Sequence, residues 1–415
     1  MHSRLDFPGI RYELEEVILP FWLERSLDHD HGGFLTCFDN YGRDLTSTDK
    51  FSWAQGRLIW VLAAAAELSL AGDLDFDGEM LIEHAIGGAR FVTENMVRDD
   101  SSCVFLTSRD GVPSDAGGES IYADCFVAMG LFRLAKATAE RHWFEIAAAI
   151  VSQAAAKVES ENPPTDPYPI PSGFASFGPR MIILATRLAE TRASAVIEPQ
   201  QRISTHALVD ARAAVLAFRQ DDGTFIDLRP MSSDDDDTLL ARHRTPGHAL
   251  EGIWMALEAS HAIGDREQTD ELVASAKIII DKAVDPIYGG IYRYMDCDGG
   301  IPKGRLVGAP YEALIQRTWS TKLWWVHSEA VYTAALCAHE GSDPLLAESA
   351  VELWDYSRRV FSTNRSAGEW VQIHDREGNV LNEVVGLPVK DPYHVARDLM
   401  QLIQLGNRVS PEVIE

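Results

Sequence analysis

Two residues one helical turn apart, His248 and Glu251, have the types and spacing that proton transfer requires. They lie in the stretch TPGHALEGIWMALE, residues 245–258. Pro246 suits the first turn of a helix, because its φ is fixed and that turn needs no N–H from it, and Thr245 is a suitable N-cap. At i and i+3 the imidazole and the carboxylate share a face, beside the positive end of the helix. A core histidine bonded to a neighbouring glutamate would show the same spacing, so this stretch alone leaves both interpretations open.

Other stretches of helical periodicity also carry polar and aromatic residues near their starts. If these helices run parallel, their first turns bring the side chains into one pocket. The further candidates for that pocket are Trp53, Gln55, Arg57, Tyr122, Asp124, Lys322, Trp324, Trp325, His327, Glu329, Tyr393, His394 and Arg397. Taken singly, several have a structural alternative: the tryptophan pair could be core, Arg57 could be an ion-pair partner, and His327 could be a structural histidine.

No pattern typical of a metal centre, a nucleotide-binding loop or a serine hydrolase is present. The motifs G-x-x-x-x-G-K-[ST], G-x-S-x-G and H-E-x-x-H are absent. The acidic run Asp234–Asp237 lacks the alternating ligands and the glycine of a calcium loop, so we expect a solvated loop there. We expect no metal ligands, and we expect His29, His31, His206 and His243 in loops or at the surface.

The composition narrows the class of ligand and the compartment. The chain has 415 residues, of which 46% are hydrophobic, and a formal net charge of −26. This charge argues against binding to nucleic acid or to an anionic membrane surface and fits a small or neutral ligand. Five scattered cysteines without a CxxC spacing favour a reducing compartment. Neither an apolar leader region nor an apolar run of 18 residues is present. We expect a cytoplasmic protein in which residues 1–415 form a single domain.

Helical periodicity dominates the chain and predicts six pairs of helices. The predicted ranges are 10–27, 50–71, 78–96, 120–139, 142–157, 176–190, 198–219, 247–263, 266–283, 318–339, 344–361 and 391–407. Glycine-rich or aromatic turns recur between the pairs, as in HGGF at 31–34, and further turns such as DNYG at 39–42 indicate short β-hairpin loops. The second helix of each pair is apolar nearly all round. This pattern favours six helical hairpins closed into an all-α (α/α)6 barrel over an open solenoid.

Stretches spread over the whole chain together resemble one family. They are FWLERSLDHDHGGFLTCFDNYGR (21–43), FSWAQGRLIW (51–60), FLTSRDGVP (105–113), SIYADCF (120–126), the 245–258 stretch, TKLWWVHSEA (321–330), GEWVQIHDREGNV (368–380) and YHVAR (393–397). The chain resembles the N-acylglucosamine 2-epimerase family, which also holds cellobiose 2-epimerases and aldose–ketose isomerases acting on mannose. The resemblance implies an (α/α)6 barrel, catalytic histidines at His248 and His394, a supporting acid at Glu251 and a substrate-binding arginine at Arg57.

One position distinguishes types within the family. The isomerase and cellobiose-epimerase members carry another histidine in the inner helix near residue 180, where this chain reads GPRMIILATRL with Ile182. This departure favours the N-acetylglucosamine 2-epimerase type. A second departure is Val326, where the family's WWPH pattern has proline.

An epimerase of that type interconverts N-acetylglucosamine and N-acetylmannosamine by removing the C2 proton of the open-chain sugar and returning one to the other face. Inversion needs two groups, and histidine suits both roles because its pKa lies near neutrality. We expect His248 and His394 to flank the substrate across the barrel, with Glu251 orienting His248. Arg57 is the expected donor to the charge developing on O1.

The aromatic candidates would hold the sugar: Trp53, Tyr122, Trp324 and Trp325. The resemblance implies no required metal or redox cofactor. It adds ATP as a possible effector, although no phosphate-binding loop is present, and a possible homodimer. Four alternatives stay open. An aldose–ketose isomerase or a cellobiose 2-epimerase would use the same pocket, a glycoside hydrolase would use a carboxylate pair such as Asp124 and Glu251, and a sugar-binding protein would have no activity.

Overall fold

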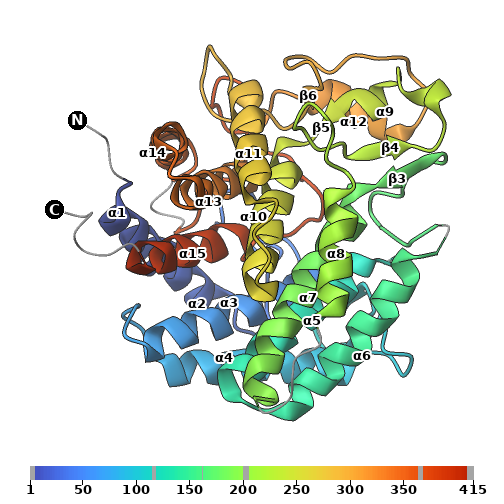
Figure 1. Cartoon of the computed structure of the whole chain (residues 1–415). Coiled ribbons are helices and arrows are strands. Elements are labelled where there is room, and N and C mark those ends of the chain that lie inside the picture. Colours follow the sequence, from blue (N-terminus) through green and yellow to red (C-terminus); the bar gives the residue numbers. More distant parts are fainter. Residues whose placement is uncertain (1–4, 115–117, 161, 200–204, 363–367, 409–415) are drawn as a thin grey trace.

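Six helices form a closed ring in the computed structural model, which describes residues 5–114, 118–160, 162–199, 205–362 and 368–408. Each packs against the next, and the last packs against the first (Figure 1). In ring order they are α3 (Ser52–Leu70), α5 (Ile121–Thr138), α7 (Phe177–Ile197), α10 (Pro246–Ile263), α13 (Trp324–Gly341) and α15 (His394–Arg408). The ring is the inner layer of the predicted barrel.

A second layer of helices covers the ring, one for each inner helix. Five of them pack on α3, α5, α7, α10 and α13 respectively: α4 (Gly78–Asn95), α6 (Arg141–Val158), α8 (His206–Leu216), α11 (Thr269–Ala283) and α14 (Pro344–Val360). The sixth position is filled by the N-terminal helical segment, which packs on α15. It comprises α1 (Phe7–Tyr12), the π-helical η1 (Glu13–Ile18) and α2 (Leu19–Arg25). The chain is therefore the (α/α)6 barrel that the sequence predicts.

The inner helices are buried nearly all round, and small residues let them approach closely. On α3 every residue from Leu58 to Ala66 is buried. A Cβ at Gly56 would lie 2.4 Å from the backbone oxygen of Phe126 on α5, and a Cβ at Gly130 would lie 2.4 Å from the backbone oxygen of Gly56. Helix α3 and helix α5 thus meet backbone to backbone, at a distance that side chains would prevent.

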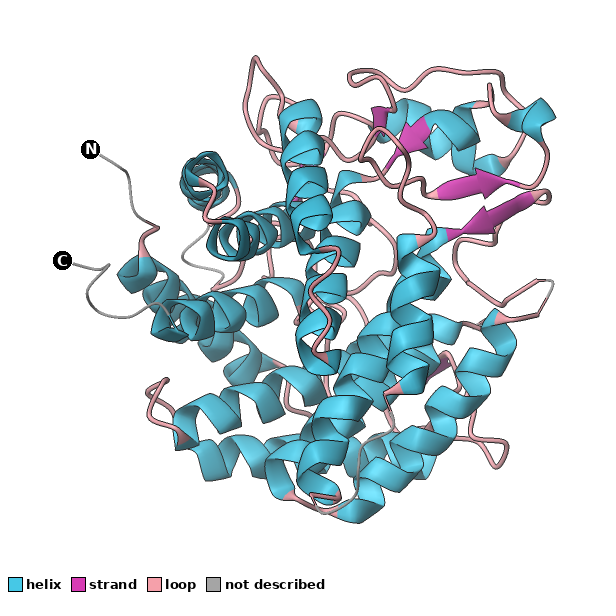
Figure 2. Cartoon of the chain, viewed as in Figure 1, coloured by secondary structure: helices cyan, strands magenta, loops and turns pink. Residues whose placement is uncertain are grey.

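Short antiparallel strands connect consecutive loops (Figure 2). The pairs are β1 (Lys50–Phe51) with β2 (Leu106–Thr107), β3 (Phe174–Ser176) with β4 (Leu228–Pro230), β5 (His243–Arg244) with β6 (Met295–Asp296), and β7 (Lys322–Leu323) with β8 (Ile373–His374). The first strand of each pair leads directly into an inner helix. The strands therefore fix where α3, α7, α10 and α13 begin. The predicted hairpin at the DNYG turn has no such strands, and a single bridge between Phe38 and Leu45 closes it.

Three short elements escaped prediction. They are the 3-10 turn η2 (Ser233–Asp235) and the helices α9 (Leu239–Arg242) and α12 (Pro310–Thr318). The helix predicted over 318–339 instead begins at Trp324, because α12 ends and β7 follows before it. Helices α9 and α12 carry part of a separate apolar cluster that includes Phe174, Leu228, Leu239, Leu240, Tyr294 and Ile315. Neither element is long enough for periodicity to reveal it.

The histidines expected at the surface divide into two groups. His29, His31 and His206 are exposed, as predicted, but the prediction for His243 was wrong. His243 is fully buried in β5, with its Nδ1 2.6 Å from the carbonyl oxygen of Leu240.

No helix within the described ranges is both long and apolar enough to span a bilayer.

Candidate active site

A cavity of about 510 Å³ opens where the inner helices begin. All six inner helices contribute to its wall within the described chain, mostly through their first turns, and the loops before them complete it. Its volume lies in the range of small-molecule sites. Of the candidates from the sequence, those that line it are Trp53, Arg57, Tyr122, His248, Glu251, Trp324, Trp325, Tyr393, His394 and Arg397.

Five candidates, Glu329 among them, lie outside the cavity, and the other four hold loops in place. Both ends of the Gln55 amide bond the backbone of Phe34. Asp124 accepts from the backbone N–H of Cys103 and from Lys157. The substrate-binding role predicted for these two residues does not fit their positions.

Lys322 and His327 follow the same pattern. The ammonium of Lys322 lies 3.5 Å from Asp285, with both side chains fully buried. The ring of His327 contacts the carbonyl of Leu323 through Nδ1 and accepts from the N–H of Ile291 at Nε2. Their spacing matched the site because they flank Trp324, Lys322 in β7 and His327 in the first turn of α13, but their side chains point toward the loops.

His248 is oriented by a carboxylate that the sequence analysis missed. Its Nδ1 lies 3.1 Å from Oδ1 of Asp227, whose other oxygen accepts from the hydroxyl of Thr245 at 3.1 Å. Burial favours the neutral ring, but the charge of Asp227, with help from Glu251, raises the pKa of His248 above its usual value. The expectation that Glu251 orients His248 was therefore wrong. Asp227 stands in a loop 21 residues earlier, where no periodic pattern distinguishes it from other acids.

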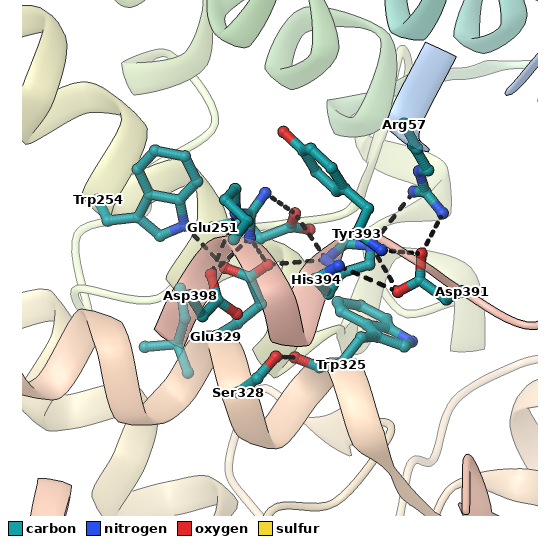
Figure 3. A network of polar contacts seen from close by, with 12 residues as sticks. Arg57, Glu251, Trp254, Trp325, Ser328, Glu329, Asp391, Tyr393, His394 and Asp398 are labelled. Atoms are coloured by element: carbon teal, nitrogen blue, oxygen red, sulfur yellow. Dashed lines mark hydrogen bonds and ion pairs between the residues drawn. The ribbon is translucent and has the colours of Figure 1, made fainter. Parts of the chain in front are cut away.

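His394 is held from both sides of its ring (Figure 3). Its Nδ1 lies 2.8 Å from Oε1 of Glu329, and its Nε2 lies 3.2 Å from Nη2 of Arg57. A guanidinium can only donate hydrogen bonds, so Nε2 of His394 is the acceptor from Arg57 and Nδ1 is the donor to Glu329. An imidazole with one donor and one acceptor nitrogen is neutral. Burial lowers the pKa of His394, and the positive charges of Arg57 and His248 act in the same direction.

Glu329 does not line the cavity, but it is the centre of a buried network that includes residues of the cavity wall. It accepts from Nε1 of Trp254 at 2.8 Å and from Arg397, which also bonds Asp398 (Figure 3). The ligand atoms of Glu251, Glu329 and His394 lie within 4.8 Å of one another, a grouping that a cation would suit. Arg397 contacts Glu329 and lies 3.9 Å from Glu251, so its guanidinium already supplies positive charge there.

Arg57 is fixed between an acid and aromatic rings. Its Nη1 lies 3.1 Å from Oδ1 of Asp391, and its guanidinium lies 4.1 Å from the centre of the Phe126 ring. Asp391 also accepts from Nε1 of Trp324 at 3.0 Å. Asp391 is a second acid that the sequence analysis missed, although it lies only two residues before the YHVAR stretch.

The two histidines start inner helices that are not directly opposite in the ring, and their flanking of the substrate stays a prediction. They come from α10 and α15, which are separated in the ring only by α13. Trp325 of α13 lies between them, with its ring centre 5.4 Å from that of His248 and 5.5 Å from that of His394. Each histidine has a carboxylate behind Nδ1, and their pKa values are shifted in opposite directions. One group is thus suited to give a proton and the other to take one.

Comparison with known proteins identifies the family of the chain. The family model described as N-acylglucosamine 2-epimerase (GlcNAc 2-epimerase) matches residues 33–397. The chain is 28% identical over 411 residues to N-acylglucosamine 2-epimerase of Mus musculus, covering 95% of this chain and 90% of that protein. It is 23% identical over 418 residues to cellobiose 2-epimerase of Ruminococcus albus, covering 96% of this chain and 98% of the relative.

Solved structures show the same fold. Cellobiose 2-epimerase from Bacillus thermoamylovorans superposes with a TM-score of 0.77 at 19% identity, covering 96% of this chain and 98% of that one. A D-mannose isomerase superposes with a TM-score of 0.71 at 17% identity, covering 97% and 99% of the two chains. The chain belongs to the N-acylglucosamine 2-epimerase family and, with it, to the enzymes that isomerise carbohydrates.

Proposed function

We propose that the protein is a sugar 2-epimerase that interconverts N-acetylglucosamine and N-acetylmannosamine. The observation that carries the proposal is the pair His248 and His394, each held by a carboxylate at Nδ1, with pKa values shifted in opposite directions. Membership of the family and the relatives named N-acylglucosamine 2-epimerase support the substrate.

The reaction needs a base on one face of C2 and an acid on the other. Nε2 of neutral His394 takes the C2 proton of the open-chain sugar, the C–H electron pair forms a C1–C2 double bond, and O1 becomes negatively charged. Charged His248 then gives its proton to the opposite face of C2, and the C1 carbonyl forms again. The roles exchange in the reverse direction, and exchange with water resets both rings.

Arg57 is our candidate for stabilising the negative O1. General acid–base catalysis raises the reaction rate by roughly 10²–10⁴-fold, so much of the lowering of the activation barrier must come from electrostatic stabilisation. A preorganised donor at the oxyanion is worth roughly 3–4 kcal/mol. Arg57 has the required charge and already donates toward Nε2 of His394, the place where a reacting C2–O1 unit must lie.

Ile182 favours the N-acyl substrate over a free aldose or cellobiose. Its side chain lines the cavity from α7, beside Met181 and Ala185. At this position the wall offers no proton donor or acceptor to a sugar hydroxyl. An aldose–ketose isomerase or a cellobiose 2-epimerase would use the same pocket, and the substrate assay below distinguishes all three activities.

The test is proton NMR in D₂O with N-acetylmannosamine, mannose and cellobiose as separate substrates, each with and without ATP. We expect N-acetylglucosamine to appear with deuterium at C2. A ketose formed from mannose would identify the protein as an aldose–ketose isomerase instead. An epimer formed only from cellobiose would identify it as a cellobiose 2-epimerase. An effect of ATP on the rate would identify it as an effector.

A further inference from the structure

Arg293 is a buried arginine in the cavity wall without an acidic partner. Its residue is 6% exposed, and within the described chain no carboxylate lies within ion-pair distance of its guanidinium. The other two arginines that line the cavity are both paired, Arg57 with Asp391 and Arg397 with Glu329. A buried cation without a counter-charge is expensive to desolvate, and the neighbouring hydroxyls of Tyr168 and Tyr294 are neutral acceptors, so an acceptor supplied by a ligand would stabilise Arg293 further.

Aromatic and apolar side chains surround this guanidinium. Its carbon lies 5.1 Å from the centre of the Tyr294 ring, whose hydroxyl is 3.3 Å from that of Tyr311. The rings of Tyr168 and Tyr311 are 6.2 Å apart. We call the part of the cavity lined by Arg293, Tyr168, Ile170, Leu228, Tyr294 and Tyr311 the tyrosine recess.

The recess is built mostly from another part of the fold, and His243 links it to the catalytic network: its ring packs on Tyr294 and Tyr311, and its Nε2 lies 3.6 Å from Asp227. Tyr294 and Leu228 belong to the apolar cluster of helices α9 and α12, and Ile170 and Tyr311 pack against that cluster. The recess is nevertheless close to the chemistry, because the charge of Arg293 contributes to the electrostatics of His248. A ligand at the two histidines can therefore extend a neighbouring substituent into it.

We propose that the tyrosine recess binds the N-acyl group of the sugar, an inference that rests on the function proposed above. The guanidinium of Arg293 donates to the acyl carbonyl oxygen, while the tyrosine rings, Ile170 and Leu228 pack against the acyl methyl group. A charge-assisted hydrogen bond to an amide oxygen is stronger than one between neutral groups. The acyl group is attached to C2, the carbon that reacts, which agrees with a recess beside His248.

The charges of the cavity favour an amide over an anionic substituent. Five carboxylates line it, those of Asp39, Asp227, Glu251, Glu383 and Asp391, against three arginines. The whole chain carries a net charge of −26. The negative charge of the cavity and that of the whole chain both oppose the entry of an anionic group, whereas a neutral carbonyl meets no such barrier.

The test compares the wild type with Arg293→Gln and with Arg229→Gln. Arg229 neighbours Leu228 in β4 but is exposed, so its variant is the matched control. Kinetics with N-acetylmannosamine are expected to show a KM raised about 10- to 100-fold in Arg293→Gln, with a smaller change in kcat. Arg293→Lys is expected to recover part of the loss, and the Arg229 variant is expected to behave as the wild type.

A binding measurement makes the result independent of turnover. The unreactive reduced sugars N-acetylmannosaminitol and mannitol are titrated by calorimetry, together with mannose 6-phosphate. We expect the wild type to prefer the N-acetyl compound and Arg293→Gln to lose that preference. Equal weakening of both alditols, a loss confined to kcat, or tighter binding of the phosphate that depends on Arg293 would each overturn the inference.

Failure of this inference differs from failure of the proposed function. If the wild type epimerises N-acetylmannosamine and Arg293→Gln does so with the same KM, the recess does not bind the acyl group and the function stands. If the wild type leaves N-acyl sugars unchanged but prefers the N-acetyl alditol through Arg293, the inference stands and the reaction must be another.

Discussion

At His248 and His394 different surroundings shift the pKa of the same side chain in opposite directions. The charge of Asp227 raises the pKa of His248, so its proton is retained to higher pH than usual. Burial lowers the pKa of His394, so this ring stays neutral to lower pH than usual. The proposed mechanism needs one proton on the pair. We therefore expect a bell-shaped profile of kcat/KM, lost in acid as His394 is protonated and lost in alkali as His248 is deprotonated.

Replacing Asp227 with Asn tests which residue sets the alkaline limb. Without the carboxylate the pKa of His248 falls, so the alkaline limb is expected to move to lower pH and the rate at neutral pH to drop roughly ten-fold or more. The measurement is the pH dependence of kcat/KM. Asp236→Asn, in the exposed loop after η2, is the control. An unshifted alkaline limb would assign that limb to another group.

Single substitutions of the two histidines separate the two faces of the substrate. His248→Gln and His394→Gln are each expected to lose epimerisation by roughly 10²–10⁴-fold, because one proton transfer is removed. The remaining histidine can still remove and return a proton on its own face. Each variant should therefore exchange deuterium into only one epimer, and the two variants into opposite epimers, as measured by NMR. Exchange into the same epimer by both would exclude the two-base assignment.

At the scale of the elements, the close contact of α3 and α5 positions Arg57. Gly56 precedes Arg57, and a side chain there would collide with the backbone of Phe126. Gly56→Ala is expected to lower the free energy of unfolding by about 1–3 kcal/mol, as overpacking does, and to reduce activity by displacing Arg57. Denaturant unfolding and the epimerase assay measure the two effects.

The same substitution in α4 provides the control for helix propensity. Gly87 is exposed, and a Cβ there would meet nothing within 4 Å. Gly87→Ala is therefore expected to stabilise the protein by about 0.5–1 kcal/mol. If the two alanine variants were equally stable, close packing of α3 on α5 would not limit this position.

The long helices could be predicted from the sequence because a buried inner helix repeats its apolar pattern over many turns. The sequence also allowed prediction of the site residues near the starts of such helices, namely His248, His394, Arg57 and the tryptophans. Asp227, Asp391 and Arg293 were not, because they stand in loops whose course is set by tertiary contacts. Gln55 and His327 were misplaced for a related reason: spacing gives the start of a helix, but the direction of a side chain at that start depends on the loop packed against it.

At the scale of the whole molecule, the barrel closes where its first and last helices meet. Glu13 of η1 is buried and accepts from Nε1 of Trp370 at 2.7 Å and from Ser362, more than 340 positions away in the chain. Glu13→Ala leaves the indole N–H without this acceptor and is expected to cost about 1–3 kcal/mol of unfolding free energy. Denaturant unfolding checks this. Glu16→Ala, on the exposed side of the same turn, should change little.

The order of the helices along the chain has a consequence for biosynthesis. His394 stands at the start of α15, the final helix of the ring, while the helices that cover α15 are α1 and η1, which leave the ribosome before every helix of the ring. These early helices have no inner partner until nearly four hundred residues have followed them. A nascent chain that still lacks α15 therefore has neither a closed barrel nor one of its two histidines. We infer that it cannot act on sugar, and that its unpaired N-terminal helices are the surface most in need of a chaperone.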